Sequence, residues 1–281
     1  MIARADQAED PAGPNVQYGI GFLRACAGAL IFSFPLVMTV EMWSIGFHIA
    51  PVRLLLFILL GMGVLVGLSY YSGLRQGGTW TDAMFEGLTA YAAGFVVSGL
   101  AMVLLGVLTS DYGWRGAVGM VALQAVPAGV GAAVARRQLG ATDDGNEDED
   151  KAGYLGQLFL MGAGAVFLAF NVAPTEEMLL ITYALGPVQA MALMAASALL
   201  LHGLVYTVGF AGQEQQADGT GFWTAFLTHT VTGYALALAL SAYVLWTFGR
   251  TDGASLLLVA SMAVVLAFPA SLGAGIARLV V

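Results

Sequence analysis

The sequence has very little charge for its length. Only 10% of its 281 residues are Asp, Glu, Lys or Arg, whereas soluble globular domains carry about 25%. Apolar residue types make up 59% of the chain, and its mean hydropathy is +0.81. This composition excludes an ordinary soluble domain and predicts a polytopic membrane protein. The main partner is then the lipid bilayer, and we expect no nucleic-acid partner.

The sequence also has a single cysteine, Cys26, in an apolar segment, which excludes an intrachain disulfide. The first residues, MIARADQAEDPAGPNVQ, lack the charged region followed by an apolar region that marks a signal peptide. This stretch is polar and contains Pro and Gly, so we interpret residues 1–17 as a disordered tail. Acidic residues outnumber basic ones by 18 to 10, with the excess concentrated in this tail and in a central linker.

Long apolar runs dominate the rest of the chain. A helix that crosses a bilayer needs about 20 mostly apolar residues. The runs predict an all-α membrane protein with about eight transmembrane helices, near residues 19–41, 51–72, 83–108, 115–135, 155–174, 187–210, 222–248 and 254–276.

An acidic linker, residues 138–152, separates the fourth predicted span from the fifth. Its run from Asp143 to Asp150 cannot enter a bilayer and has little tendency to fold. A calcium loop is the alternative. The run lacks the Asp-x-Asn/Asp-x-Asn/Asp-Gly spacing of an EF-hand, so we interpret it as a solvated cytoplasmic linker.

Basic residues predict the orientation of the chain. With eight spans, both termini lie on the same side of the membrane, and Lys and Arg in short loops favour the cytoplasm. Seven basic residues fall on the side of the termini and three on the other side. We therefore expect a multi-pass protein of the inner (plasma) membrane with cytoplasmic N- and C-termini.

The two halves of the chain resemble each other. Shifting the first half by 136 residues without gaps aligns fifteen identities over the 47 columns from residue 27 to residue 73. They include Glu41 with Glu177, a residue type that membrane helices rarely match by chance. Later segments match at shifts of 143 and 142, among them Trp80-Thr81 with Trp223-Thr224 and PAGVGAAVAR (127–136) with PASLGAGIAR (269–278). The matches indicate an internal duplication.

We therefore predict two parallel four-helix repeats, residues 18–137 and 153–281. Each repeat has an even number of spans, so both halves enter the membrane from the same side. A pseudo-two-fold axis along the membrane normal should relate them. Parallel repeats of this kind occur in transporters, whose binding sites lie at the interface between repeats.

Each repeat carries a carboxylate just after its first span. Glu41 follows about 34 Å of helix at 1.5 Å per residue, which places it near the outer boundary of a roughly 30 Å core. Pro35 and Pro174 precede the two acids, and the apolar segments MWSIGFHIA and MLLITYALG follow them. These segments are too short to span. We predict a broken first helix followed by a re-entrant or interfacial segment in each repeat.

The breaks would expose oxygen ligands that suit hard cations such as calcium, magnesium or sodium. Like carboxylates held close together repel, so one of them should hold a proton or bind a cation. The alternative is structural, because acids that follow Thr175 resemble the first turn of a capped helix. The predicted cation- or proton-binding residues are Glu41, Glu177, Glu176, Thr39, Thr175 and Asn171, and the identity of any metal stays open.

Glu86 and His229 occupy the same position in the two repeats. They would form either an ion pair across the pseudo-axis or a proton relay, because ionisable groups in spans are costly and mark function by default. His202 has no ionisable partner in the first repeat, and we interpret it as a packing residue.

These features favour a cation channel or transporter that uses an inorganic cation or proton and needs no cofactor. A pore on the pseudo-axis needs one chain and a pore between subunits needs several, so a homo-oligomer stays open. The alternative of a different class is a membrane assembly or regulatory protein with no transport path.

A third class is an intramembrane metal-dependent hydrolase. Glu176-Glu177, His202 and His229 are similar to the Glu-Glu and two-His pattern of the CAAX-prenyl-protease-like membrane proteins. That family's motifs are Glu-Glu-x-x-x-Arg and Phe-x-x-x-His. Here no Arg lies near Thr182, and Ala stands at both Phe positions. We therefore expect that the protein is not an enzyme.

In its layout and its NVAPTEEM segment, the whole chain resembles an uncharacterised bacterial family of integral membrane proteins with a duplicated helical core of this length. The resemblance implies a membrane fold and carries no activity, cofactor or site residue.

Overall fold

The structure is a computed structural model that describes residues 14–71, 79–140, 153–212 and 226–280. Every regular element in these ranges is helical, and eight helices are long and apolar enough to cross a membrane, which confirms the predicted fold class. Most of the predicted tail and of the acidic linker lies outside the described residues. The long helices are α1 (Pro14–Val37), α3 (Pro51–Tyr71), α4 (Trp80–Leu104), α5 (Gly113–Gly140), α6 (Tyr154–Val172), α8 (Pro187–Gly212), α10 (Thr232–Thr247), which continues the π-helix η2 (Phe226–Val231), and α11 (Leu256–Val280).

Local sequence signals set the ends of these helices. Helices α3 and α8 begin at Pro51 and Pro187, where the missing N–H is not needed and the fixed φ suits a first turn. Helices α4 and α10 each end in a Schellman motif, in which a glycine adopts a left-handed conformation. These glycines are Gly106 (φ 69°) and Gly249 (φ 74°), which occupy equivalent positions at a shift of 143 residues.

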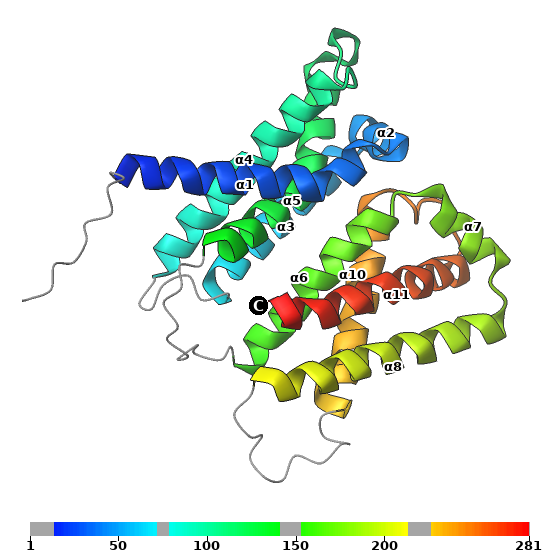
Figure 1. The fold of residues 1–281 in the computed structure, drawn as a ribbon. Helices are drawn as coiled ribbons and strands as arrows, with labels where there is room; N and C mark the ends of the chain where they lie inside the picture. Colours follow the sequence, from blue (N-terminus) through cyan, green and yellow to red (C-terminus); the bar gives the residue numbers. More distant parts are fainter. Residues whose placement is uncertain (1–13, 72–78, 141–152, 213–225, 281) are drawn as a thin grey trace, which may run out of the picture.

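Two short helices interrupt the pattern of long spans. Helix α2 (Val40–His48) follows α1, and helix α7 (Glu176–Ala184) follows α6. Their bounds differ by 136 residues at both ends, as the sequence alignment predicts. Figure 1 places both at the same end of the molecule, which we call the short-helix end. The predicted segment after each broken first helix is therefore a nine-residue helix.

Within each half, the first and last long helices cross at glycines. A Cβ atom built on Gly28 of α1 would overlap the carbonyl oxygen of Gly131 on α5, and one built on Gly164 of α6 would overlap that of Gly273 on α11. Small residues at such crossings let two backbones approach closely, which favours association of helices in a lipid environment. The same pairs of helices pack in both halves, which supports the predicted duplication.

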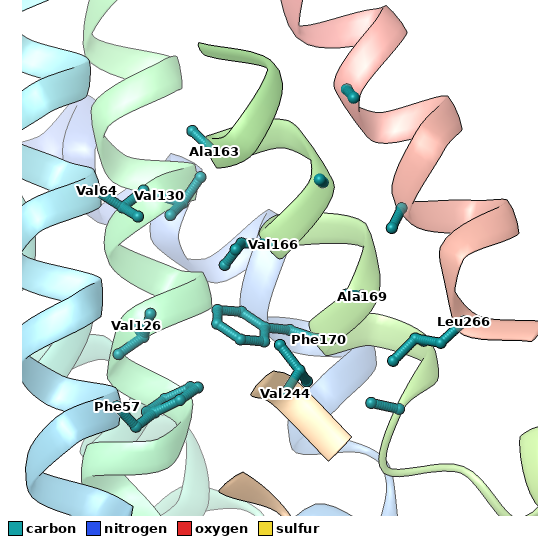
Figure 2. Close-up of a cluster of buried hydrophobic side chains, with 14 of the residues drawn as sticks. Phe57, Val64, Val126, Val130, Ala163, Val166, Ala169, Phe170, Val244 and Leu266 are labelled. Atoms are coloured by element: carbon teal, nitrogen blue, oxygen red, sulfur yellow. The ribbon is translucent and has the colours of Figure 1, made fainter. Parts of the chain in front are cut away.

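Helix α3 forms the main contact between the halves. It packs against α6 and α10 of the second half, and Figure 2 shows Phe57 facing Phe170 and Val244 across this boundary. The ring centroid of Phe57 lies 4.8 Å from that of Phe170 and 5.9 Å from that of Phe248. Buried aromatic side chains therefore join the halves at this boundary.

The contact between the halves is one-sided. A two-fold axis would repeat the packing of α3 on α6 and α10 as packing of α8 on α1 and α4. In the described part of the chain, the main contacts of α8 are with α11, α10 and η2 of its own half. The arrangement therefore departs from the predicted pseudo-two-fold axis. Leu193 of α8 stands at the position of Phe57, so α8 has no aromatic side chain where α3 places one against Phe170.

The glycine crossing gives a test of the packing. Replacing Gly164 with Val should force α6 and α11 apart and lower the stability by about 1–3 kcal/mol, the usual cost of overpacking. Thermal unfolding in detergent, followed by size-exclusion chromatography, measures the change. Gly63→Val is the matched control, because no heavy atom lies within 4 Å of a Cβ built on Gly63. Equal losses in the two variants would contradict the close crossing.

Candidate functional site

The short-helix end holds a charged cluster that joins the two halves. Its centre is Arg250, in the turn between α10 and α11, directly after the left-handed Gly249. The guanidinium of Arg250 donates a hydrogen bond to the carbonyl oxygen of Pro174, in the break between α6 and α7. The same turn therefore ends α10 and supplies a hydrogen-bond donor to the Pro174 carbonyl, which has no helical partner because of the break.

Two carboxylates from different halves act on this guanidinium. Burial lowers the pKa of Arg250, and the negative charges of Glu176 and then Glu41 oppose that shift. An arginine side chain stays protonated in proteins, so Arg250 keeps its charge at any physiological pH. Glu41 is half-buried on α2, and Glu176 is exposed at the start of α7. The guanidinium supplies one positive charge against two carboxylates, and this excess of negative charge favours cations.

Arg250 links Glu41 to Glu176. It does not link Glu41 to Glu177, which is the counterpart of Glu41 in the second repeat. Glu177 is exposed in the first turn of α7, where acidic side chains interact favourably with the helix dipole. Position 107, the counterpart of Arg250 in the first half, is Val. The electrostatics of the two breaks therefore differ, although their backbones correspond.

Hydrogen bonds from side chains satisfy the carbonyls at the two breaks. The Thr39 and Thr175 hydroxyls donate to the carbonyls of Leu36 and Val172, at 2.7 and 2.8 Å. The two threonines precede the short helices, but neither side chain caps the new helix. The Leu36 carbonyl also accepts a hydrogen bond from the buried Gln124 amide at 3.1 Å. Any cation would have to compete with these protein donors for the same oxygens.

Two further side chains bond within the breaks. The Trp43 indole N–H donates to the Val37 carbonyl at 2.6 Å. The Asn171 amide donates to the Phe167 carbonyl, one turn earlier in α6, at 2.8 Å. Asn171 therefore turns its donor toward its own helix, leaving its side-chain oxygen as the remaining polar atom.

A bidentate ion pair holds the turn of Arg250 against the first half. Arg53, near the start of α3, donates to both carboxylate oxygens of Asp252 at 2.8 and 2.6 Å. The Arg53 guanidinium also lies over the Trp246 ring, 5.0 Å from its centroid. These hydrogen bonds hold the pKa of the Asp252 carboxyl below its usual range. The pair thus fixes where Arg250 lies relative to α2 and α3.

The predicted histidines lie far from this cluster. His229 belongs to η2, at the other end of the third span of its half, and contacts Gln157 and Thr228 at 3.2 and 2.9 Å. Eighteen residues separate it from Thr247, a rise of roughly 27 Å along the helix. His202 lies 2.8 Å from the Thr230 hydroxyl. The hydrolase alternative needs Glu176-Glu177 beside the histidines, and this structure keeps them apart.

Among the described residues, no three His, Cys, Asp or Glu side chains are grouped closely enough to hold a metal ion. Glu86 lies half-buried on α4, and its pairing with His229 stays a prediction. The contacts given above for His229 lie within the second half.

Sequence reasoning used Arg250 only as a marker of orientation and missed its place in the site. The signal that could have found it is the alignment itself, because an arginine opposite a valine in a duplicated membrane segment breaks the repeat. The alignment also matches hydroxyl-bearing residues that the structure buries on the third span of each half. These residues are Tyr91 and Ser98 in the first half and Tyr234 and Ser241 in the second.

Fold and site together define a multi-pass, all-helical integral membrane protein. A comparison with known families is consistent with this class: the family described as "Putative integral membrane protein (DUF2391)" matches residues 21–281. The chain belongs to that family, which confirms the expected resemblance to a family of integral membrane proteins. The matched range includes both halves and every residue of the charged cluster. Neither a curated protein nor a solved structure matches the chain.

The Arg53–Asp252 pair predicts a pH dependence. Because the pKa of Asp252 is depressed in the folded protein, its stabilisation is present above about pH 4, the ordinary value, and is lost as pH falls through the folded value. Asp252→Asn should lower the melting temperature at neutral pH by a few degrees at most. The difference from the wild type should shrink below pH 4. Asp111→Asn, an exposed acid at the same end, is the control. A difference that persists unchanged at acid pH would contradict the ion pair.

Proposed function

We propose that the protein is a cation channel or transporter whose outer binding site lies between its halves at the short-helix end. The observation that carries the proposal is that Arg250, which bonds to the break before α7, is acted on by the charges of Glu176 and Glu41, from different halves. Carboxylate oxygens are hard ligands that suit inorganic cations. The orientation with both termini in the cytoplasm, in the inner membrane, belongs to the same proposal.

Arg250 acts in this proposal as a tethered counter-ion. While the guanidinium stays beside the carboxylates, it neutralises part of their charge and weakens binding of a free cation. A change in the separation of the halves would move Glu41 relative to Glu176 and alter the balance between Arg250 and a cation. Such a rocking motion of one repeat against the other is how many repeat-built transporters expose a site to alternate sides.

The other predicted residues have supporting roles. Glu177, exposed beside Glu176, adds negative charge at the entrance. Thr39, Thr175 and Asn171 stabilise the breaks through their hydrogen bonds and keep the short helices in place. Glu86 and His229, on the third span of each half, form the relay that we propose for the opposite end of the path.

A second candidate is a membrane assembly protein with no transport path. The observation that favours it is that protein donors already occupy the carbonyls at Leu36, Val37, Val172 and Pro174. In that case the charged cluster serves only to hold the halves together.

A flux assay tests the proposal. The purified protein, reconstituted in liposomes, should carry a current of sodium, potassium or protons that ion-sensitive dyes detect. Glu41→Gln and Glu176→Gln should each lower the flux at least about tenfold, equivalent to about 1.4 kcal/mol of lost cation stabilisation. Glu177→Gln is the matched control and should retain most of the flux, because the charges that act on Arg250 are those of Glu176 and Glu41.

Two outcomes would overturn the proposal. Absence of flux for all three ions with a folded, reconstituted wild type would favour the assembly protein. Equal losses in the three Gln variants would show that general negative charge, and not the Arg250 cluster, controls the flux.

A further inference from the structure

A close backbone crossing holds helix α2 against the first half. A Cβ atom built on Gly46 would lie 2.7 Å from the Cα atom of Met120 on α5, and one built on Gly119 would overlap the Gly46 carbonyl oxygen. Glycine at both positions therefore lets the two backbones touch. The equivalent residues of the second half are Thr182 on α7 and Ser261 on α11. Because both carry side chains, α7 and α11 cannot cross as closely at this place.

Hydrogen bonds from side chains also anchor α2 and the break before it. The Trp43 indole and the Gln124 amide, which come from α2 and α5, donate to carbonyls at the end of α1. The counterparts of these two residues are Leu179 and Leu266, whose side chains carry no hydrogen-bond donor. The second half therefore cannot form the two anchoring bonds of the first.

The last turn of α2 is packed on the first half by an aromatic ring. The Phe47 ring fills the space beside Gly116 and lies edge-on to Tyr112, with ring centroids 5.5 Å apart. Leu258 stands at the position of Gly116, so a side chain occupies the equivalent recess. The counterpart of Phe47 is Tyr183 on α7, which is 69% exposed, whereas Phe47 is 43% exposed. The far end of α7 is therefore less closely packed than that of α2.

Arg250 supplies the tether of α7 that the first half does not have. Its guanidinium donates to the carbonyl of Pro174, two residues before α7, and of the two carboxylates that act on it Glu176 has the larger effect. Both contacts lie at the first turn of α7, so they hold one end of the helix. In Figure 1, α7 crosses from α6 to α8 at the outer edge of the second half. A single charged side chain thus takes the place of several neutral anchors.

We propose that α7 is the movable short helix of this protein, that α2 stays docked, and that Arg250 is the latch that holds α7 in place. Release of the latch would let α7 swing about the break after α6 and carry Glu176 away from Glu41. The crossing of α6 and α11 at Gly164 lies outside this movement, so the body of the second half would keep its packing.

The trigger of the latch rests on the proposed function. A cation bound by Glu176 would offset the negative charge that attracts Arg250 and would weaken the latch. Binding of the cation and opening of α7 would then be coupled, and each would favour the other. The site would open in the second half alone.

Distances between paired spin labels test which short helix moves. In a Cys26→Ser chain, Leu180→Cys and Leu257→Cys place labels on α7 and α11. A matched chain carries Ser44→Cys and Arg115→Cys, at the equivalent positions of α2 and α5. All four positions are exposed, so the labels should not disturb packing. We expect a wider distribution of distances across α7 than across α2 in the purified, reconstituted protein.

Substitution of Arg250 tests the latch. Arg250→Gln should lengthen and broaden the distances of the α7 pair and leave those of the α2 pair unchanged. Glu176→Gln removes the charge of an exposed side chain, should change the α7 pair in the same direction, and serves where Arg250→Gln does not fold. Gly46→Thr gives α2 the residue that α7 carries and should broaden the α2 pair, which shows that the labels detect undocking.

Equal widths for the two pairs in the wild type would overturn the proposal, as would an α7 distribution that neither Arg250→Gln nor Glu176→Gln changes. Sodium chloride in place of N-methylglucamine chloride at equal ionic strength should broaden the α7 pair, and no change would overturn the cation trigger. The flux assay separates this inference from the proposed function. Flux with an immobile α7 would overturn the latch alone, whereas an α7 that opens in a protein without flux would support the latch and overturn the proposed function.

Discussion

A bilayer offers no water to the backbone, so every peptide group within it must find a partner inside the protein. The long helices meet this constraint by themselves. The breaks after α1 and α6 do not, and the chain satisfies them with side chains of four kinds: threonine hydroxyls, the Gln124 amide, the Trp43 indole and the Arg250 guanidinium. The placement of polar residues in this otherwise apolar protein follows largely from those two interruptions.

Different hydrogen-bond donors satisfy the carbonyls at the two breaks, and this difference distinguishes the two halves. In the first half, neutral donors from α2 and α5 bond to the free carbonyls. In the second half, the Pro174 carbonyl accepts from a charged side chain that comes from the turn before α11. A charge brought to this place requires counter-charges, and Glu176 and Glu41 supply them. Glu176, the acid found only in the second half, is thus explained by Arg250, the base found only in that half. Glu177 is the acid that the duplication repeats.

Much of the fold could be predicted because repeated apolar periodicity decides it. The eight spans and the equivalence of the two short segments follow from run length, from prolines at helix starts and from the shift of 136 residues. That each short segment is a nine-residue helix was not predicted. The relation between the halves could not be predicted in the same way. Alignment reveals what the halves share, and the interface between them depends on residues that differ, such as Phe57 against Leu193 and Arg53 against Gln189. The role of Arg250 was missed for the same reason, since its counterpart is Val107.

A one-sided interface between similar halves has a consequence for the charged cluster. Only the boundary formed by α3, α6 and α10 carries the Arg53–Asp252 pair and Arg250, so only this boundary is held by charge. The equivalent positions of the other half are Gln189, Thr109 and Val107, which are neutral. The charged cluster therefore occurs once in the chain rather than once in each half, because it needs Arg53 from one half together with Asp252 and Arg250 from the other.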